Sequence, residues 1–117
     1  MTVPHEVPEL NYITLTGTVE RIEQLSLTRY NIYVIKFEVE NTITITTGTG
    51  DDRKSSSILL IEAWGNLAEE IDRRVKRGSL VLIEGCLVSR SYEDRSKGLH
   101  HKMIVKASSV ETLGVRS

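Results

Sequence analysis

A two-residue alternation of apolar and polar side chains recurs along most of this chain and constrains the fold more than any other feature. In the first such segment, one face carries Ile13, Leu15, Gly17 and Val19; threonine fills the positions between them, and Glu20 follows. Side chains two positions apart lie on the same face of a strand, so this alternation is typical of a half-buried β-strand. The many β-branched residues of the segment favour the same structure.

Four further segments alternate in the same way. They predict strands over residues 30–40, 58–64, 79–92 and 99–107. Between the second and third strands, residues 46–57 are turn formers and charged residues with nothing to bury, which predicts a long mobile loop. A charged turn at residues 93–98 joins the last two strands.

The alternation is replaced once, at residues 66–77, by apolar residues at helical spacing. One narrow stripe is formed by Leu67, Ile71 and Val75. Asn66 is placed to cap this helix, and Glu69 follows at the spacing of a capping box. Three strands, a helix and two strands are the order of elements in the OB-fold. We therefore predict an all-β chain, an OB-fold five-stranded Greek-key barrel with one helix between the third and fourth strands.

The alternating segments define one domain over residues 11–113. Residues 1–10 hold both prolines and show no periodicity, so we expect a flexible N-terminal arm, and residues 114–117 form a short C-terminal end. No apolar run approaches the ~20 residues of a membrane helix, and the first residues lack a signal-peptide pattern. The single cysteine, Cys86, suits a reducing compartment. We expect a cytoplasmic protein without membrane contact.

Charge and motifs indicate binding without catalysis. The net charge is −1, which argues against a ligand held by electrostatics alone. Residues 1–50 hold three basic and six acidic side chains, whereas residues 51–117 hold twelve and ten, so an anionic ligand should meet the second half. No phosphate loop, dinucleotide fingerprint or nucleophile elbow occurs. Adjacent His100 and His101 point to opposite faces of a strand and cannot share one metal by themselves. We expect neither enzymatic activity nor a cofactor; an enzyme or metal-binding domain remains an alternative.

Two segments resemble a known family. Residues 61–69 read Ile-Glu-Ala-Trp-Gly-Asn-Leu-Ala-Glu, and residues 75–87 read Val-Lys-Arg-Gly-Ser-Leu-Val-Leu-Ile-Glu-Gly-Cys-Leu. In order and spacing they resemble the bacterial single-stranded DNA-binding protein family, which has an aromatic-Gly-x-Leu-Ala-Glu turn and a strand ending in Glu-Gly-x-Leu. The resemblance extends over roughly residues 11–113. The related primosomal replication protein of the same fold is an open alternative.

The resemblance implies low-specificity binding of single-stranded DNA, in DNA replication, recombination or repair. It places Trp64 and Tyr92 at base-stacking positions. It also places Arg90, Lys76 and Arg77 at basic positions that hold the DNA strand. The last two also end the predicted helix, where the helix dipole alone favours cations.

The residue pattern supports part of this site independently. The two-residue period puts Trp64 on an outward face together with Glu62, and it puts Tyr92 outward on the same face as Arg90. Cations in the two predicted loops could contact the phosphates along a bound DNA strand. They are Arg53, Lys54, Arg95 and Lys97. The other ring-bearing side chains are interpreted as core or rim packing, namely Tyr30, Tyr33 and Phe37.

The chain departs from the family at several positions. Ile58 replaces one stacking tryptophan, and the position of another falls near Ile45. The missing tryptophans, an aromatic content of only 5% and the acidic first half favour an alternative function, an OB-fold protein-interaction module in a replication complex with weak DNA binding. We expect residues 114–117 to lack the family's acidic tail, which argues against recruitment of other replication proteins through such a tail.

Apolar residues on outward faces predict self-association. They are Ile32, Val34, Ile58, Leu60, Leu80, Leu82, Val88 and Ile104. A monomer would leave a large apolar surface in water, which usually marks an interface. We expect a homo-oligomer, and the resemblance points to a dimer or a tetramer. It also implies replication proteins as further partners.

Overall fold

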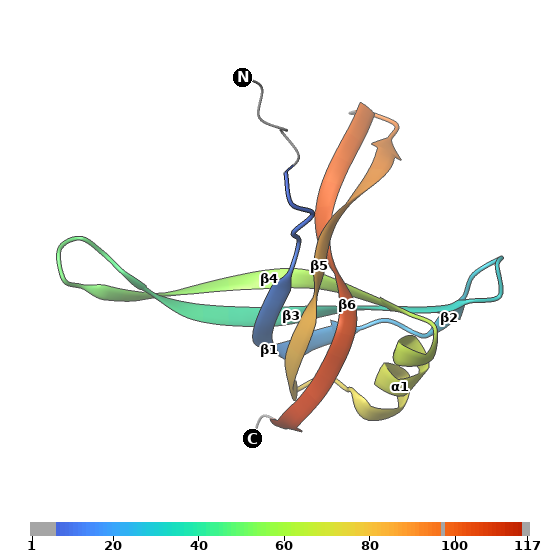
Figure 1. Cartoon of the computed structure of the whole chain (residues 1–117), viewed down its shortest axis with the longest axis horizontal. Helices are drawn as coiled ribbons and strands as arrows, with labels where there is room; N and C mark the ends of the chain where they lie inside the picture. Colours follow the sequence, from blue (N-terminus) through green and yellow to red (C-terminus); the bar gives the residue numbers. More distant parts are fainter. Residues whose placement is uncertain (1–6, 97, 116–117) are drawn as a thin grey trace.

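The computed structural model describes residues 7–96 and 98–115, so part of the predicted N-terminal arm, Lys97 and residues 116–117 lie outside the described residues. The elements follow the predicted order (Figure 1), with one additional short strand. They are β1 (Ile13–Ile22), β2 (Ser26–Leu27), β3 (Tyr33–Thr46), β4 (Asp52–Trp64), α1 (Asn66–Arg74), β5 (Ser79–Asp94) and β6 (Gly98–Val115). Among the described residues, no helix has the length and apolar character needed to cross a membrane.

The strands form a closed barrel. The hydrogen-bonded order is β1-β5-β6-β4-β3-β2, and β1 also pairs with β3. The N-terminal part of β1 runs antiparallel to β5, and its register shifts between Val19 and Arg21 where it pairs with β3. A short parallel contact, Ile61 opposite Val105, joins β4 to β6. The predicted OB-fold barrel is confirmed, with the helix between β4 and β5.

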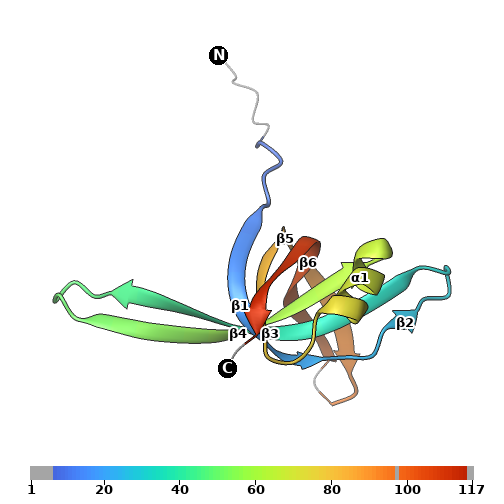
Figure 2. The same ribbon diagram turned by 90° about the horizontal axis from the view of Figure 1, so that it is seen from below.

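The alternating residues fill the barrel as predicted. Val19, Phe37 and Ile83 are among the fully buried side chains. Helix α1 lies beside the barrel (Figure 2) and contributes buried Ala68 and Ile71 to the same core. Of the predicted stripe, Ile71 is buried, Leu67 packs against the core, and Val75 joins the core from just beyond the helix.

The predicted long loop over residues 46–57 is wrong. β3 continues to Thr46 and β4 begins at Asp52, so the two strands form a hairpin whose turn occupies only residues 47–51. The outer part of this hairpin, residues 42–56, projects from the barrel (Figure 1) and is called the hairpin arm below. A ladder pairs its backbone groups without burying side chains, and threonine favours extended backbone. The strands of the hairpin arm therefore could not be predicted from composition alone.

The helix is shorter than predicted and begins differently. Its N-cap residue is Gly65, whose φ of 66° lets β4 turn directly into the helix, and no side chain makes a capping hydrogen bond. Asn66 is already helical, so the predicted cap there is wrong. The helix ends at Arg74, before the predicted boundary, because the backbone of Val75 is extended and directs its side chain into the core.

Four side chains differ from their predicted faces. The two-residue period places Leu87 on the core face of the strand predicted over residues 79–92, and Tyr33 was interpreted as core or rim packing, but both are exposed. Val34 and Ile104, predicted to lie outside, are buried within the chain. The outer face of the barrel is thus partly covered by the chain itself.

Replacing Gly85 by alanine should destabilise the fold. A Cβ at this position would lie 2.2 Å from the Lys106 carbonyl oxygen, at the register shift between β5 and β6. We expect a loss of about 1–3 kcal/mol in urea unfolding. Gly48→Ala is the matched control because no atom lies within 4 Å of its Cβ. Equal unfolding midpoints for the two variants would contradict this close approach.

Candidate nucleic-acid interface

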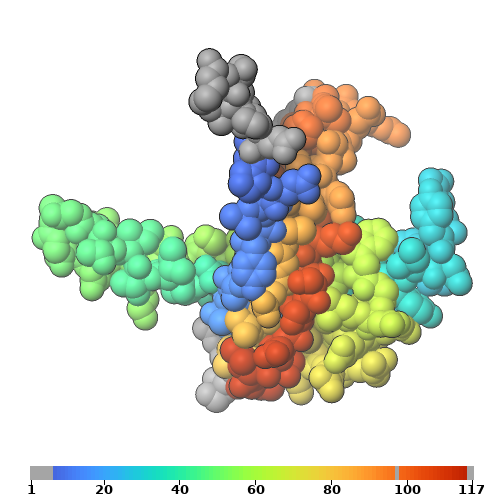
Figure 3. All heavy atoms as spheres, in the orientation of Figure 1, coloured from blue at the N-terminus to red at the C-terminus, as the bar shows by residue number. Residues whose placement is uncertain are grey.

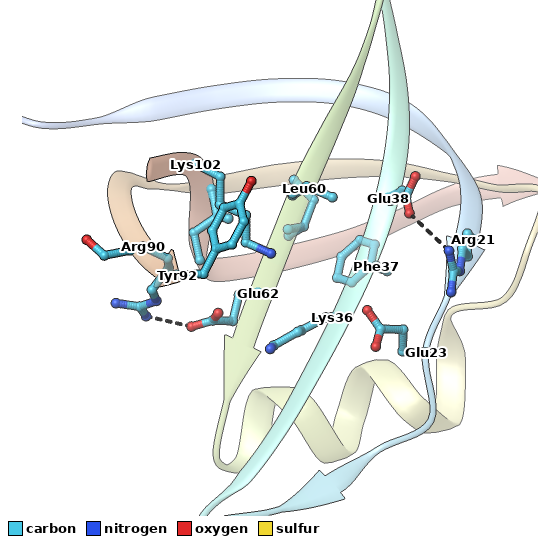
Figure 4. A pocket seen from close by; sticks show the side chains of 13 residues that line it. Arg21, Glu23, Lys36, Phe37, Glu38, Leu60, Glu62, Arg90, Tyr92 and Lys102 are labelled. Carbon is cyan, nitrogen blue, oxygen red and sulfur yellow. Dashed lines mark hydrogen bonds and ion pairs between the residues drawn. The ribbon is translucent and has the colours of Figure 1, made fainter. Parts of the chain in front are cut away.

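An open groove of about 280 Å³ lies on the outer face of β3 and β4, beside the β5–β6 hairpin (Figure 4). Leu60 and Ile104 give it an apolar lining, and Tyr92 stands at one side. Charged side chains of both signs surround this lining. The cations are Arg21, Lys36, Arg90 and Lys102, and the carboxylates are Glu23, Glu38 and Glu62. The groove therefore combines apolar and aromatic surface with a nearly balanced set of charges.

Glu62 links two of the predicted site residues. Trp64 Nε1–H donates to Glu62 Oε1 at 2.6 Å, and Arg90 Nη2 donates to the same oxygen at 2.7 Å. Residues 62 and 64 share a face of β4 by the strand period, whereas Arg90 arrives from β5. Glu62 lies outside the barrel core as predicted, but it is only 5% exposed. The two-residue period could not indicate this burial, because Arg90 reaches Glu62 from a distant part of the chain.

The network keeps the Glu62 carboxylate ionised. Burial alone would raise its pKa, but the hydrogen bonds from Arg90 and Trp64 and the charges of Arg90 and Lys36 outweigh burial. The pKa of Glu62 is therefore lowered from its ordinary value.

Tyr92 presents an exposed ring at the edge of the groove. It is 49% exposed and stacks on His100 from the opposite strand, with ring centroids 5.3 Å apart. Lys102 Nζ lies 6.0 Å from the Tyr92 centroid, and Asp94 Oδ2 lies 4.0 Å from His100 Nε2. Sequence reasoning missed His100 and Lys102 as site residues; the register of the last two strands would have indicated both. The hairpin thus offers an aromatic surface next to a cation.

The remaining predicted cations lie in three separate places. Arg53 and Lys54 are exposed on the hairpin arm, and as neighbours on β4 they point to opposite faces. Arg95 is exposed in the turn between β5 and β6, and Lys97 there lies outside the described residues. Lys76 and Arg77 are exposed between α1 and β5. Figure 3 shows the hairpin arm and the β5–β6 hairpin projecting from the body. The structure therefore groups Arg90 with Trp64 and Tyr92, but it does not bring the five described cations of these three places into the groove lining.

One further aromatic group was misjudged. Tyr30, interpreted as packing, is 70% exposed at the turn between β2 and β3. Arg29 lies over its ring at 4.9 Å and donates to its hydroxyl at 2.9 Å. The sequence feature that could have indicated this exposed aromatic group is an arginine directly followed by a tyrosine in a turn. At the departures from the family pattern, Ile58 and Ile45 are exposed isoleucines of the β3–β4 hairpin.

The barrel and its groove define the chain as an OB-fold protein with an open groove on its outer face. Within the part of the chain that the structure describes, no three His, Cys, Asp or Glu side chains are grouped as a metal site would require. The sequence model of the Single-strand binding protein family matches residues 10–113. The chain belongs to this family, and the resemblance noted from residues 61–87 is confirmed.

Individual relatives agree with this assignment. The chain is 33% identical over 85 residues to single-stranded DNA-binding protein 2 of Streptomyces coelicolor, covering 71% of this chain and 43% of that protein. It is 36% identical over 55 residues to single-stranded DNA-binding protein 1 of Synechocystis, covering 46% of each. The matches thus span less than half the length of these relatives.

Two solved structures share the fold. A deletion mutant of the single-stranded DNA binding protein from Thermus aquaticus has a TM-score of 0.77 at 21% identity, covering 89% of this chain and 50% of that one. The Plasmodium falciparum SSB, in complex with ssDNA, has a TM-score of 0.82 at 18% identity, covering 92% and 98%. Both support the OB-fold barrel.

Glu62→Gln should make stability less sensitive to acid. Because the folded-state pKa of Glu62 lies below its ordinary 4.5, the ionised carboxylate stabilises the fold above that pH. This stabilisation is lost as the pH falls through the folded-state pKa. Between about pH 5 and about pH 3, the Tm of the wild type should fall further than that of the variant. Equal falls in Tm would contradict the network.

Proposed function

We propose that this protein binds single-stranded DNA with low sequence specificity and acts in DNA replication, recombination or repair. The observation that carries the proposal is the Glu62 network, which joins Trp64 to Arg90 beside the groove that Arg90 and Tyr92 line. Family membership supports it, as does the ssDNA complex of the similar Plasmodium falciparum protein. Single Cys86 supports a reducing, cytoplasmic compartment as part of the proposal.

In this proposal, bases stack on aromatic rings and phosphates meet cations. A base stacked on an aromatic ring contributes ~1–3 kcal/mol without sequence preference, because every base has a π-face. Tyr92 and Trp64 supply the rings, and Arg90 supplies a cation between them that can meet a phosphate. The other cations predicted from the sequence would contact phosphates of the same DNA outside the groove. They are Arg53, Lys54, Lys76, Arg77 and Arg95, together with Lys97, which lies outside the described residues.

Tyr92→Ala should weaken binding to a labelled dT oligonucleotide about five- to 150-fold, the equivalent of one lost stacking contact. Fluorescence anisotropy of the label measures the affinity. Tyr92→Phe is the matched control, because it keeps the ring and should retain the affinity. The proposal fails if the wild type does not bind the oligonucleotide at low salt. Equal affinities for Tyr92→Ala and the wild type would remove Tyr92 from the interface.

A second candidate is a protein-interaction module, with replication proteins as partners and weak DNA binding. The mixed charge of the groove favours it, since three carboxylates face four cations there. Two exposed apolar residues of the β5–β6 hairpin, Leu87 and Met103, also suit a protein contact. Absence of oligonucleotide binding together with retention of replication proteins on the immobilised chain would select this candidate.

Self-association remains part of the proposal. Ile32 and Ile58 are exposed as the interface prediction requires, and Leu80 and Leu82 are partly buried. Val34 and Ile104 no longer support it, because they are buried within the chain. We expect a dimer or a tetramer by sedimentation equilibrium. A monomer at micromolar concentration would contradict this expectation.

A further inference from the structure

We infer that Glu62 is a positioning residue of the interface, which orients Trp64 and Arg90 through a single carboxylate oxygen. The inference rests on the proposed function and names the group on which that site depends. Both donors converge on Oε1, at 2.6 Å from Trp64 Nε1 and 2.7 Å from Arg90 Nη2. The negative charge of a glutamate in this groove would repel an anionic ligand, so we infer that Glu62 has a role other than direct ligand contact.

The hydrogen bond to Trp64 fixes the direction of the ring. The indole N–H is the only polar group of a tryptophan side chain, so a bond to it sets where the ring edge points. Lys106 Nζ lies 5.8 Å from the ring centroid. A ring held in this way loses less freedom when a base stacks on it, and prior ordering of this kind strengthens binding.

The second hydrogen bond holds Arg90 without hiding it. Its side chain remains 42% exposed while the Glu62 side chain is only 7% exposed. A guanidinium has five N–H donors in a planar fork, so it can donate to Glu62 and to a phosphate at once. The Glu62 carboxylate therefore acts as the buried anchor for one stacking group and one phosphate-binding group.

Glu38 provides a matched comparison in the same groove. Its carboxylate lies 3.8 Å from Arg21 Nη1, whose side chain is 71% exposed. If carboxylates here acted only through charge, removing either one would relieve repulsion of phosphate and raise affinity. A positioning role predicts opposite signs, because Glu62→Ala also releases Trp64 and Arg90.

The experiment compares Glu62→Ala and Glu38→Ala by oligo-dT anisotropy and by iodide quenching of Trp64 in the free protein. Trp64 is the single tryptophan, so the emission reports it alone. Glu62→Ala should weaken oligo-dT binding about tenfold, within the range of one stacking contact, and increase iodide quenching about twofold. Glu38→Ala should bind as tightly as the wild type or more tightly, with quenching unchanged.

Two further variants keep the test decisive. Glu62→Met fills similar space without an acceptor and replaces Glu62→Ala if that variant does not fold, with the same expected losses. Glu62→Gln retains an acceptor for the indole and should keep Trp64 protected from iodide. The positioning role is overturned if Glu62→Ala and Glu38→Ala change affinity in the same direction, or if Glu62→Ala leaves quenching unchanged. Failure of the wild type to bind oligo-dT would instead overturn the proposed function, since quenching in the free protein needs no DNA.

Discussion

Closure of the barrel by β1 fixes the inside and the outside of this molecule. β1 pairs with β5 through its first half and with β3 through its second, so every alternating strand has one face toward a common core. Because side chains alternate strictly, burying Phe37 and Ile61 inside commits Lys36 and Glu62 to the outer face. A one-residue slip in any strand would lose both the core and the groove. The site is thus a direct consequence of core packing.

The long strands then create the groove. β3 and β4 give it a floor, and the β5–β6 hairpin leaves the barrel and twists past β4, bringing Arg90 to Glu62. The carboxylate is buried only because residues from two elements cover it. Two hydrogen bonds to one oxygen offset the unfavourable burial of its charge. The same Glu62 carboxylate therefore contributes to the stability of the fold and positions the side chains proposed to contact the ligand.

Most of the fold and part of the site could be predicted from the sequence, for physical reasons. The two-residue period placed Trp64 and Tyr92 outside the core without any knowledge of partners. It could not predict the burial of Glu62, because the covering Arg90 lies 28 residues away in the chain. It also missed the hairpin arm, where backbone ladders need no apolar side chains. The stacking partner His100 became evident only from the β5–β6 register.

We propose that Trp64, Tyr92 and Arg90 form a contact surface for single-stranded DNA. Titration of Trp64 emission with oligo-dT at low salt tests it most directly, because the chain has one tryptophan. We predict saturable quenching that is reversed by added salt, as release of counterions from phosphates requires. Emission that stays constant up to saturating oligonucleotide, with no retention of the DNA at low salt, would contradict the account.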